Sequence, residues 1–327
     1  MSIKIIKPGV LATLQDEGRH GLRSIGVGSN GAMDIFAMQT ANYLCGNDEQ
    51  PAVIEINFPA PEILFEQDAM ISLTGADLAA TINEKPVPVW TTIFVKKDTV
   101  LKFKQAASGA RTYLAVHGGW KAEKWMNSYS THLKLAAGGH HGRALQKDDT
   151  VNFAAGQIVF AENKILPWHI SQNELNKIYA FENSIRCIKA AEYDWLDEGS
   201  KQNFEQNNFT ISNQSDRMGY RLTGNGLFSK QTASLISSAV DAGIVQLLPD
   251  GNCIVLMADH QTTGGYPRIA AVVKADLPKL AQLSAGKKIS FTIVGIKEAE
   301  DALISMQEQL AEIRSACRFH LEKYLPH

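Results

Sequence analysis

Short apolar runs rich in β-branched residues, each bounded by Gly, Asp, Asn or Pro, recur along most of this 327-residue chain. Such close spacing favours antiparallel barrels or sandwiches over alternating strand–helix units. We therefore predict a mainly β fold. The expected strands include residues 69–74, 87–90, 92–95, 100–103, 111–116, 209–212, 244–248, 253–257, 269–273 and 288–294.

Three segments have helical periodicity instead. Residues 32–44 place apolar side chains on one face and stop at Gly46, and residues 277–283 form a shorter candidate. A long amphipathic helix is predicted over residues 298–325. Sequence alone leaves open whether that helix packs on its own domain or on a partner.

The chain is long enough for two domains with separate cores. Between residues 155 and 183 the sequence becomes irregular and polar, which favours a domain boundary there. We predict β domains over residues 1–165 and 166–297, followed by the helix over 298–327. A faint repeat, residues 15–21 against residues 214–220, is consistent with duplication of one β domain.

Composition narrows the class of protein. The formal net charge is -2, so neither charge sign indicates nucleic acid or an anionic membrane surface as a partner. No apolar run approaches the length of a membrane span, and the N-terminus lacks a signal-peptide core. The four cysteines are scattered singly, and Cys253 lies in an apolar run, which indicates free thiols in a cytoplasmic protein.

The densest polar segment runs from Met257 to Arg268, between two predicted strands. Its Gly-Gly pair lets backbone N–H groups approach a ligand closely, and its other side chains supply hydrogen-bond donors and acceptors. A structured turn is the alternative, and we favour a site. The candidate residues are Asp259, Gln261, Thr262, Gly264, Gly265 and Tyr266.

A second segment, residues 214–222, contains the adjacent pair Asp216 and Arg217. A guanidinium binds oxyanions bidentately, so this pair could orient a carboxylate or phosphate. An ordinary surface ion pair explains it equally well.

A third set lies near the N-terminus. Asp16 with Arg19 repeats the pairing of an acid with a base, and Gln15 adjoins it. Asp34 opens the first helix, where helix capping explains it best. Glu55 lies in an apolar run, where a carboxylate needs a partner or a role unless the strand has a wet face.

Several familiar motifs do not occur. His117, His140 and His141 lack paired metal-ligand spacing, so we assign no metal site. There is no Walker A sequence, no GxGxxG, no GxSxG and no biotin-attachment segment.

The motifs together resemble the 5-oxoprolinase C-subunit family, also labelled allophanate hydrolase subunit 2 or biotin-dependent carboxyltransferase-like. That family includes a sporulation-linked antagonist of a histidine-kinase inhibitor. The resemblance runs from about residue 5 to residue 295. It rests on the motifs at residues 15–19, 31–34, 73–77, 113–119, 214–222 and 259–267.

The resemblance implies two cyclophilin-like β domains and a B subunit that joins in phosphorylating 5-oxoproline with ATP and Mg²⁺. The A subunit then completes hydrolysis to glutamate. A relative, the carboxyltransferase domain of urea carboxylase, moves a carboxyl group from carboxybiotin to urea. All these substrates present an amide-like N–C=O, which needs donors and acceptors. Our hypothesis is that one site is lined by Asp16, Arg19, Asp34, Asp216, Arg217, Asp259, Gln261 and Tyr266.

The chain departs from the family pattern in places. Tyr129 stands where an Arg is usual and Ser238 where a Glu is usual, while residues 26–30 and 190–192 also differ. Three functions therefore stay open: a subunit of 5-oxoprolinase, a biotin-dependent carboxyltransferase acting on urea or a related amide, and a non-catalytic regulator of a B-subunit-like protein.

Overall fold

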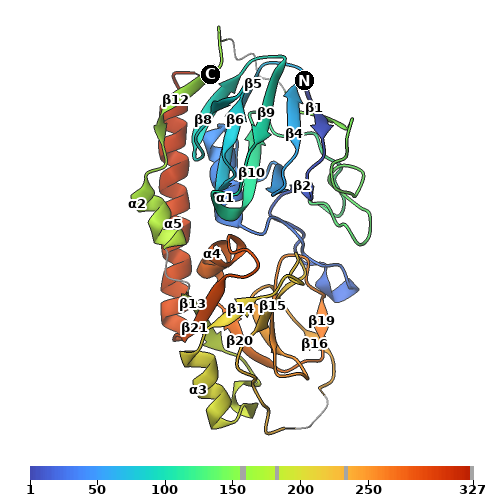
Figure 1. The fold of residues 1–327 in the computed structure, drawn as a ribbon, viewed down its shortest axis with the longest axis vertical. Coiled ribbons are helices and arrows are strands. Elements are labelled where there is room, and N and C mark those ends of the chain that lie inside the picture. The colour runs from blue at the N-terminus through green and yellow to red at the C-terminus, as the bar shows by residue number, and fades with distance from the viewer. Residues whose placement is uncertain (155–159, 181–183, 232–234, 325–327) are drawn as a thin grey trace. The chain divides into compact units, whose positions relative to one another are not determined.

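The computed structural model describes residues 1–154, 160–180, 184–231 and 235–324. The chain divides into two compact units, each assembled from separate stretches (Figure 1). Unit 1 comprises Met1–Arg19, Asp34–Leu175 and Glu308–His327. Unit 2 comprises His20–Met33 and Asn176–Gln307. The domain boundaries predicted after residues 165 and 297 remain a prediction.

Unit 1 is built from two six-stranded antiparallel sheets. Their inward faces share one apolar core that includes Ile5, Ile54, Phe65 and Leu114. The first sheet has the order β11(Thr150–Asn152), β1(Ser2–Lys7), β4(Glu62–Phe65), β9(Thr99–Phe103), β6(Ala80–Ile82), β7(Lys85–Pro86). The second has the order β12(Lys164–His169), β8(Thr91–Val95), β5(Ala69–Asp77), β10(Ser108–Val116), β3(Val53–Asn57), β2(Ala12–Gln15).

Helix α1(Ile35–Leu44) packs on the second sheet through hydroxyl groups. The side chain of Ser72 donates to the carbonyl of Ala41 at 2.7 Å, and Thr92 donates to Leu44 at 2.6 Å. Both hydroxyls are buried and use helix carbonyls as acceptors, which satisfies polar groups that water does not reach. The serine and threonine side chains of these strands therefore donate hydrogen bonds to carbonyl groups of the helix.

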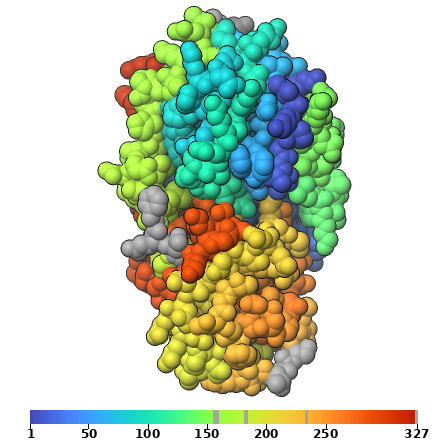
Figure 2. Space-filling model, viewed as in Figure 1, coloured from blue at the N-terminus to red at the C-terminus, as the bar shows by residue number. Residues whose placement is uncertain are grey.

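The segment that follows β10 runs alongside β1 and β2, as the green strip beside the dark blue strands shows (Figure 2). Backbone hydrogen bonds join Thr131 to Leu14, Leu145 to Ala12 and Asp148 to Ile5. In the second sheet, this irregular segment thus takes the place of a strand beyond the edge strand β2.

Unit 2 contains a closed barrel with the order β13-β20-β17-β18-β15-β14-β21. Stacked aromatic rings fill its core, and the centroids of Phe204 and Phe291 lie 4.7 Å apart. The seven strands are β13(Ser184–Lys189), β14(Phe209–Ile211), β15(Gly219–Thr223), β17(Ile244–Leu247), β18(Cys253–Leu256), β20(Arg268–Val272) and β21(Lys288–Ile293). A small two-stranded sheet pairs β16(Ser238–Ala239) with β19(Thr263–Gly264).

The helices partly match the prediction. The predicted α1, α4(Leu277–Ala281) and α5(Ile296–Leu321) are present, whereas α2(Gln172–Tyr179) and α3(Glu198–Gln206) were not predicted. Three short 3-10 helices lie at Arg23–Ile25, Tyr193–Trp195 and Lys274–Asp276. The strand predicted over residues 87–90 is wrong, because pairing stops at Pro86. In unit 1, Leu321 of α5 packs with Met70 and Phe94, so this end of the helix covers its own unit.

The mainly β prediction is confirmed, with one closed barrel and a long C-terminal helix. All four cysteines are free and buried, as predicted for Cys253. Among the described residues, no helix is long and apolar enough to cross a membrane.

Candidate functional site

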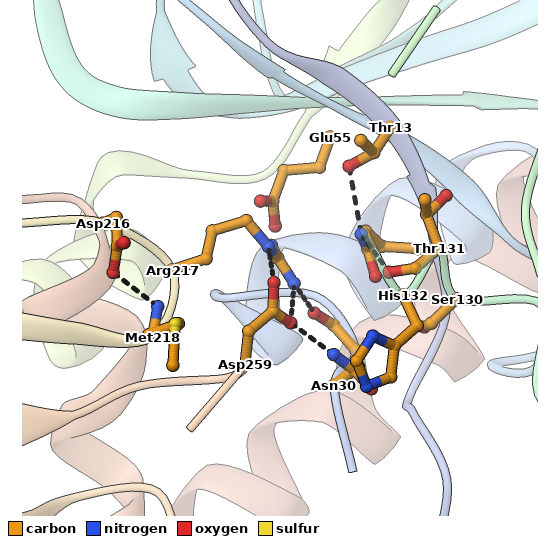
Figure 3. A network of polar contacts seen from close by, with 12 residues as sticks. Thr13, Asn30, Glu55, Ser130, Thr131, His132, Asp216, Arg217, Met218 and Asp259 are labelled. Atoms are coloured by element: carbon orange, nitrogen blue, oxygen red, sulfur yellow. Dashed lines mark hydrogen bonds and ion pairs between the residues drawn. The ribbon is translucent and has the colours of Figure 1, made fainter. Parts of the chain in front are cut away.

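The main polar constellation of unit 2 joins Arg217, Asp259 and Asn30 (Figure 3). Arg217 Nε lies 2.9 Å from Asp259 Oδ2, and its Nη2 lies 3.0 Å from Oδ1. The same Nη2 donates to the Gly31 carbonyl at 2.6 Å, while Asn30 Nδ2 donates to Asp259 Oδ1 at 2.7 Å. This is a bidentate, charge-assisted pair with an amide attached to it.

The barrel brings these residues together although Arg217 and Asp259 are 42 positions apart. Strands β15 and β18 are antiparallel neighbours, with Gly219 opposite Leu256. Beyond the paired residues, the Asp259 N–H still donates to the Arg217 carbonyl at 2.8 Å. The two side chains therefore leave the same end of the strand pair.

The pair is almost completely buried, since the side chains of Arg217 and Asp259 are 5% and 12% exposed. Removing two charges from water costs free energy that their attraction roughly offsets, so such a pair is weak evidence for stability. It does fix the orientation of both groups. We interpret it as a preorganised element that presents Asp259 and Asn30 in defined positions.

Asp216 has a local role in the same turn. Its Oδ1 accepts hydrogen bonds from the N–H groups of Met218 at 2.8 Å and Gly219 at 3.2 Å (Figure 3). The structure thus places Arg217 with Asp259, whereas the sequence suggested a pairing with the adjacent Asp216.

The loop after Asp259 continues the constellation. Gln261 Nε2 lies 3.4 Å from Oε1 of the buried Gln246. A Cβ atom on Gly264 would lie 2.6 Å from Gln246 Nε2, which explains why glycine occupies this position. Thr262 is joined to Val240 by a backbone hydrogen bond of 3.2 Å. A Cβ atom on Gly265 would lie 3.4 Å from the side chain of Ser237, just before β16.

Exposure differs along this loop. The Tyr266 side chain is 45% exposed, in line with a wall available to a ligand. Ser238, one of the departures from the family pattern, pairs with Gly264 in the small sheet. The loop is therefore held from one side by β16 while its aromatic end faces solvent.

In unit 1, Asp16 and Arg19 hold the segment after β10. Asp16 Oδ1 accepts from the hydroxyls of Ser128 at 2.6 Å and Ser130 at 2.5 Å, and its Oδ2 accepts from the Tyr129 N–H at 2.6 Å. Arg19 donates to the carbonyls of Trp125 and Ser130 and lies 4.7 Å from the centre of the Trp125 ring. Both residues therefore have structural contacts, and their predicted catalytic roles remain predictions.

Asp34 caps α1, as the capping interpretation expected, because its carboxylate accepts from the Ala37 N–H at 2.9 Å. Its own N–H donates to the Tyr113 hydroxyl at 2.9 Å, and that hydroxyl donates to Glu55 Oε2 at 3.0 Å. Burial is the main cause that raises the pKa of Tyr113 well above its ordinary value, with Glu55 adding to it. The phenol is therefore a donor toward Glu55.

Gln15 lies on β2 and donates through Nε2 to the Thr13 hydroxyl at 3.0 Å. Its Oε1 atom is buried without a hydrogen-bond partner in the described part of the chain. A buried acceptor without a donor is uncommon, and a ligand or water N–H or O–H group would satisfy it.

Two of the three histidines noted in the sequence have carboxylate neighbours, whereas His117 Nδ1 lies 2.7 Å from the Cys45 carbonyl oxygen. His140 lies 3.6 Å from Asp149, and His141 lies 2.9 Å from Glu123. Burial is the main cause that lowers the pKa of His140. Within the described ranges, no group of three His, Cys, Asp or Glu side chains is placed to hold a metal ion.

Comparison with known proteins now assigns the family. Residues 25–293 match the model described as "Carboxyltransferase domain, subdomain A and B". The chain belongs to this carboxyltransferase family. The resemblance recognised in the motifs is thereby confirmed.

Two relatives match this chain almost end to end. The chain is 37% identical to the 5-oxoprolinase C subunit of Haemophilus influenzae over 93% of this chain and 94% of that one. It is 36% identical to the 5-oxoprolinase C subunit of Escherichia coli, over 98% of this chain and 99% of that one.

Larger proteins contain a similar region. A urea amidolyase of Saccharomyces cerevisiae is 27% identical over 93% of this chain, which corresponds to 17% of that protein. Among solved structures, the urea carboxylase of Kluyveromyces lactis superposes with a TM-score of 0.88 at 22% identity, over 95% of this chain and 29% of that one. The fold is therefore shared with one region of a much longer chain.

Sequence reasoning did not assign Asn30 to the site. The helix cap that the sequence predicted nearby is Asp34. One signal was available: Asn30 directly precedes a motif glycine, and asparagine tolerates the positive φ of 53° found here.

Proposed function

We propose that this chain is the C subunit of an ATP-dependent 5-oxoprolinase and acts in a complex. The observation that carries the proposal is the identity of 36–37% with two 5-oxoprolinase C subunits over 94% and 99% of their lengths. The urea amidolyase match covers only 17% of its protein. The match over nearly the whole of both C subunits therefore favours the oxoprolinase assembly.

The chemistry of the unit 2 constellation supports this substrate class. The lactam ring of 5-oxoproline offers one N–H donor and one carbonyl acceptor. Asp259 is a carboxylate acceptor, and the Asn30 amide carries both a donor and an acceptor. Arg217 holds Asp259 in place through two hydrogen bonds, so the substrate need not reorganise these groups.

We assign the loop residues to the same substrate. Gln261 adds a second amide, and Gly264 and Gly265 allow close approach of the backbone. Asp16, Arg19, Asp34, Asp216, Gln15 and Glu55 stay candidate site residues, with the contacts described above.

The complex would contain a B subunit, which shares the phosphorylation of 5-oxoproline, and an A subunit, which completes ring opening to glutamate. ATP with Mg²⁺ belongs to that assembly, since transfer of a phosphoryl group to the lactam oxygen needs positive charge around the phosphates. We further propose a cytoplasmic location and a cyclophilin-like classification for both β units.

The test is glutamate release from 5-oxoproline in the presence of ATP and Mg²⁺. This chain is mixed with the A and B subunits of a 5-oxoprolinase, and each protein is omitted in turn. We expect glutamate only from the complete mixture. Equal glutamate release without this chain would refute the proposal.

A biotin-dependent carboxyltransferase acting on urea is the second candidate. The family description and the similarity to urea amidolyase favour it. Urea presents the same amide-like N–C=O to Asp259 and Asn30. Urea-dependent consumption of carboxybiotin by this chain, in place of glutamate release, would decide for this alternative. Binding to a B-subunit-like protein with neither reaction would instead indicate the regulatory function.

A further inference from the structure

We call residues 259–266 the substrate loop. The proposed function leaves one buried side chain of this loop without a role. His260 stands between Asp259 and Gln261, and its side chain is 0% exposed. A buried imidazole needs partners for its polar atoms. The contacts of its two ring nitrogens differ, and they indicate what the ring does.

His260 Nδ1 lies 2.6 Å from the carbonyl oxygen of Gln261. A carbonyl oxygen can only accept, so the hydrogen bond requires that Nδ1 carry the proton. The hydrogen bond closes a short link between adjacent residues and fixes the direction of the Gln261 carbonyl.

The other nitrogen, Nε2, is buried without a hydrogen-bond partner among the described residues. Asp241 Oδ1 lies 3.7 Å away from it. The other oxygen of Asp241 is held by Arg23 Nη1 at 3.0 Å, and the same Nη1 donates to the Val240 carbonyl at 3.2 Å. The ring therefore lies between the loop and the Asp241–Arg23 ion pair.

The rest of the loop has separate support. Thr263 and Gly264 pair with β16, and the carbonyl of Thr262 accepts from the Val240 N–H at 3.2 Å. The first part of the loop, at Gln261, has only weaker side-chain support, since the Gln261 amide meets Gln246 at 3.4 Å. Loss of the imidazole should thus loosen Gln261 and leave the β16 pairing in place.

We propose that His260 is a positioning residue for the substrate loop. Its Nδ1–H holds the Gln261 carbonyl, while its bare Nε2 makes no hydrogen bond to Asp241, whose Oδ1 lies 3.7 Å away. The loop role follows from geometry alone, whereas the link to substrate binding rests on the proposed function.

The first experiment measures the tautomer by ¹⁵N NMR of the histidine-labelled full-length chain at pH 8. The His260 signals are assigned by their loss in His260→Asn. We expect the proton on Nδ1 and a bare Nε2. A proton on Nε2, directed at Asp241, would overturn the proposal.

The second experiment measures amide hydrogen exchange in the loop. In His260→Ala we expect exchange in the 259–262 segment to become about five- to tenfold faster, the change expected when a hydrogen bond is lost, with little change around Gly264. His260→Asn should restore protection, because its amide N–H can replace Nδ1–H. Unchanged exchange in folded His260→Ala would contradict the proposal.

Two further variants act as controls. Asp241→Asn should keep the Nδ1–H tautomer and loop protection, because an amide N–H can donate to the bare Nε2. Loss of protection there would show that Nε2–H to Asp241 was the essential bond, against the proposal. His141→Ala changes a histidine that is 62% exposed and should not alter the loop.

The link to substrate is tested in the assembled enzyme. There His260→Ala should raise KM for 5-oxoproline more than it lowers kcat, and His260→Asn should recover most of the loss. An effect on the loop without an effect on KM would refute the link to substrate while leaving the loop role intact.

Discussion

Replacing Asp16 by asparagine tests whether this residue is mainly structural. The Asp16 carboxylate accepts four hydrogen bonds, three on Oδ1 and one on Oδ2. In Asp16→Asn one oxygen becomes an NH₂ group. The Tyr129 N–H, now 2.6 Å from Oδ2, would then face a donor, and the three remaining bonds would lose the charge.

A hydrogen bond to a charged group contributes about 1.5–3 kcal/mol, and a buried donor left without an acceptor costs a similar amount. We therefore expect Asp16→Asn to lower the free energy of unfolding of unit 1 by about 2–4 kcal/mol. The matched control is Asp216→Asn, since Asp216 also accepts from the N–H two residues later but is exposed. We expect that change to cost less than about 1 kcal/mol.

The assay is urea unfolding of both variants, followed by circular dichroism and tryptophan fluorescence. Trp125, which stacks near Arg19, reports on the segment that Asp16 holds. The transition that involves unit 1 should move to lower urea in Asp16→Asn only. Equal, small shifts in both variants would refute the structural role of Asp16 and return it to the catalytic candidates.

Three further predictions follow from single contacts. Hydrogen bonding to Arg143 is the main cause that lowers the pKa of Asp149 to about 2, so the folded state favours the carboxylate. This contribution to stability is complete above the ordinary pKa of 3.8 and is lost as pH falls through about 2. Between pH 3.8 and pH 2 the free energy of unfolding should therefore fall less in Arg143→Gln than in the wild type. The same dependence on pH in both proteins would contradict the assignment. A Cβ atom on Gly142 would lie 1.9 Å from the Ala136 backbone, whereas Gly286 has open space and a similar positive φ. Measured by thermal unfolding, the free energy of unfolding should fall by at least about 3 kcal/mol in Gly142→Ala and by about 1–2 kcal/mol in Gly286→Ala. Equal losses would show that backbone strain, and not the steric overlap at Gly142, causes the destabilisation. Burial also raises the pKa of the thiols of Cys45, Cys187 and Cys253 to about 12. Iodoacetamide should therefore modify these thiols only after denaturation. Fast labelling of the native chain would refute their burial.

The mainly β fold was predictable because period-two patterns and turn residues are local signals. The missed α2 and α3 are short and polar, and α2 lies within the polar stretch that was interpreted as a domain boundary. Residues 87–90 have the composition of a strand, but Pro88 has no N–H group to donate to a neighbour.

The candidate site, too, was only partly predictable from the sequence. The motif around Asp259 could be singled out from its density of polar groups beside a Gly-Gly pair. Its pairing with Arg217 could not, because the order of strands in the barrel is set by packing across the whole unit. Asp216 and Arg217 are adjacent in the sequence, which suggests an ion pair. In the structure their side chains have different partners.

Asn30 supplies the most direct test of the central claim that the Asn30–Asp259 group binds the lactam. Asn30→Gly removes the amide without straining a backbone whose φ is 53°, and Asn83→Gly, at φ 49° in a turn of unit 1, is the matched control. The measurement is 5-oxoproline-dependent ADP formation by this chain in the presence of the B subunit together with ATP and Mg²⁺. We predict that the wild type and Asn83→Gly form ADP only when 5-oxoproline is present, and that Asn30→Gly requires at least about tenfold more of it, as expected when a hydrogen bond between substrate and site is lost. Equal 5-oxoproline dependence in all three proteins would contradict the account.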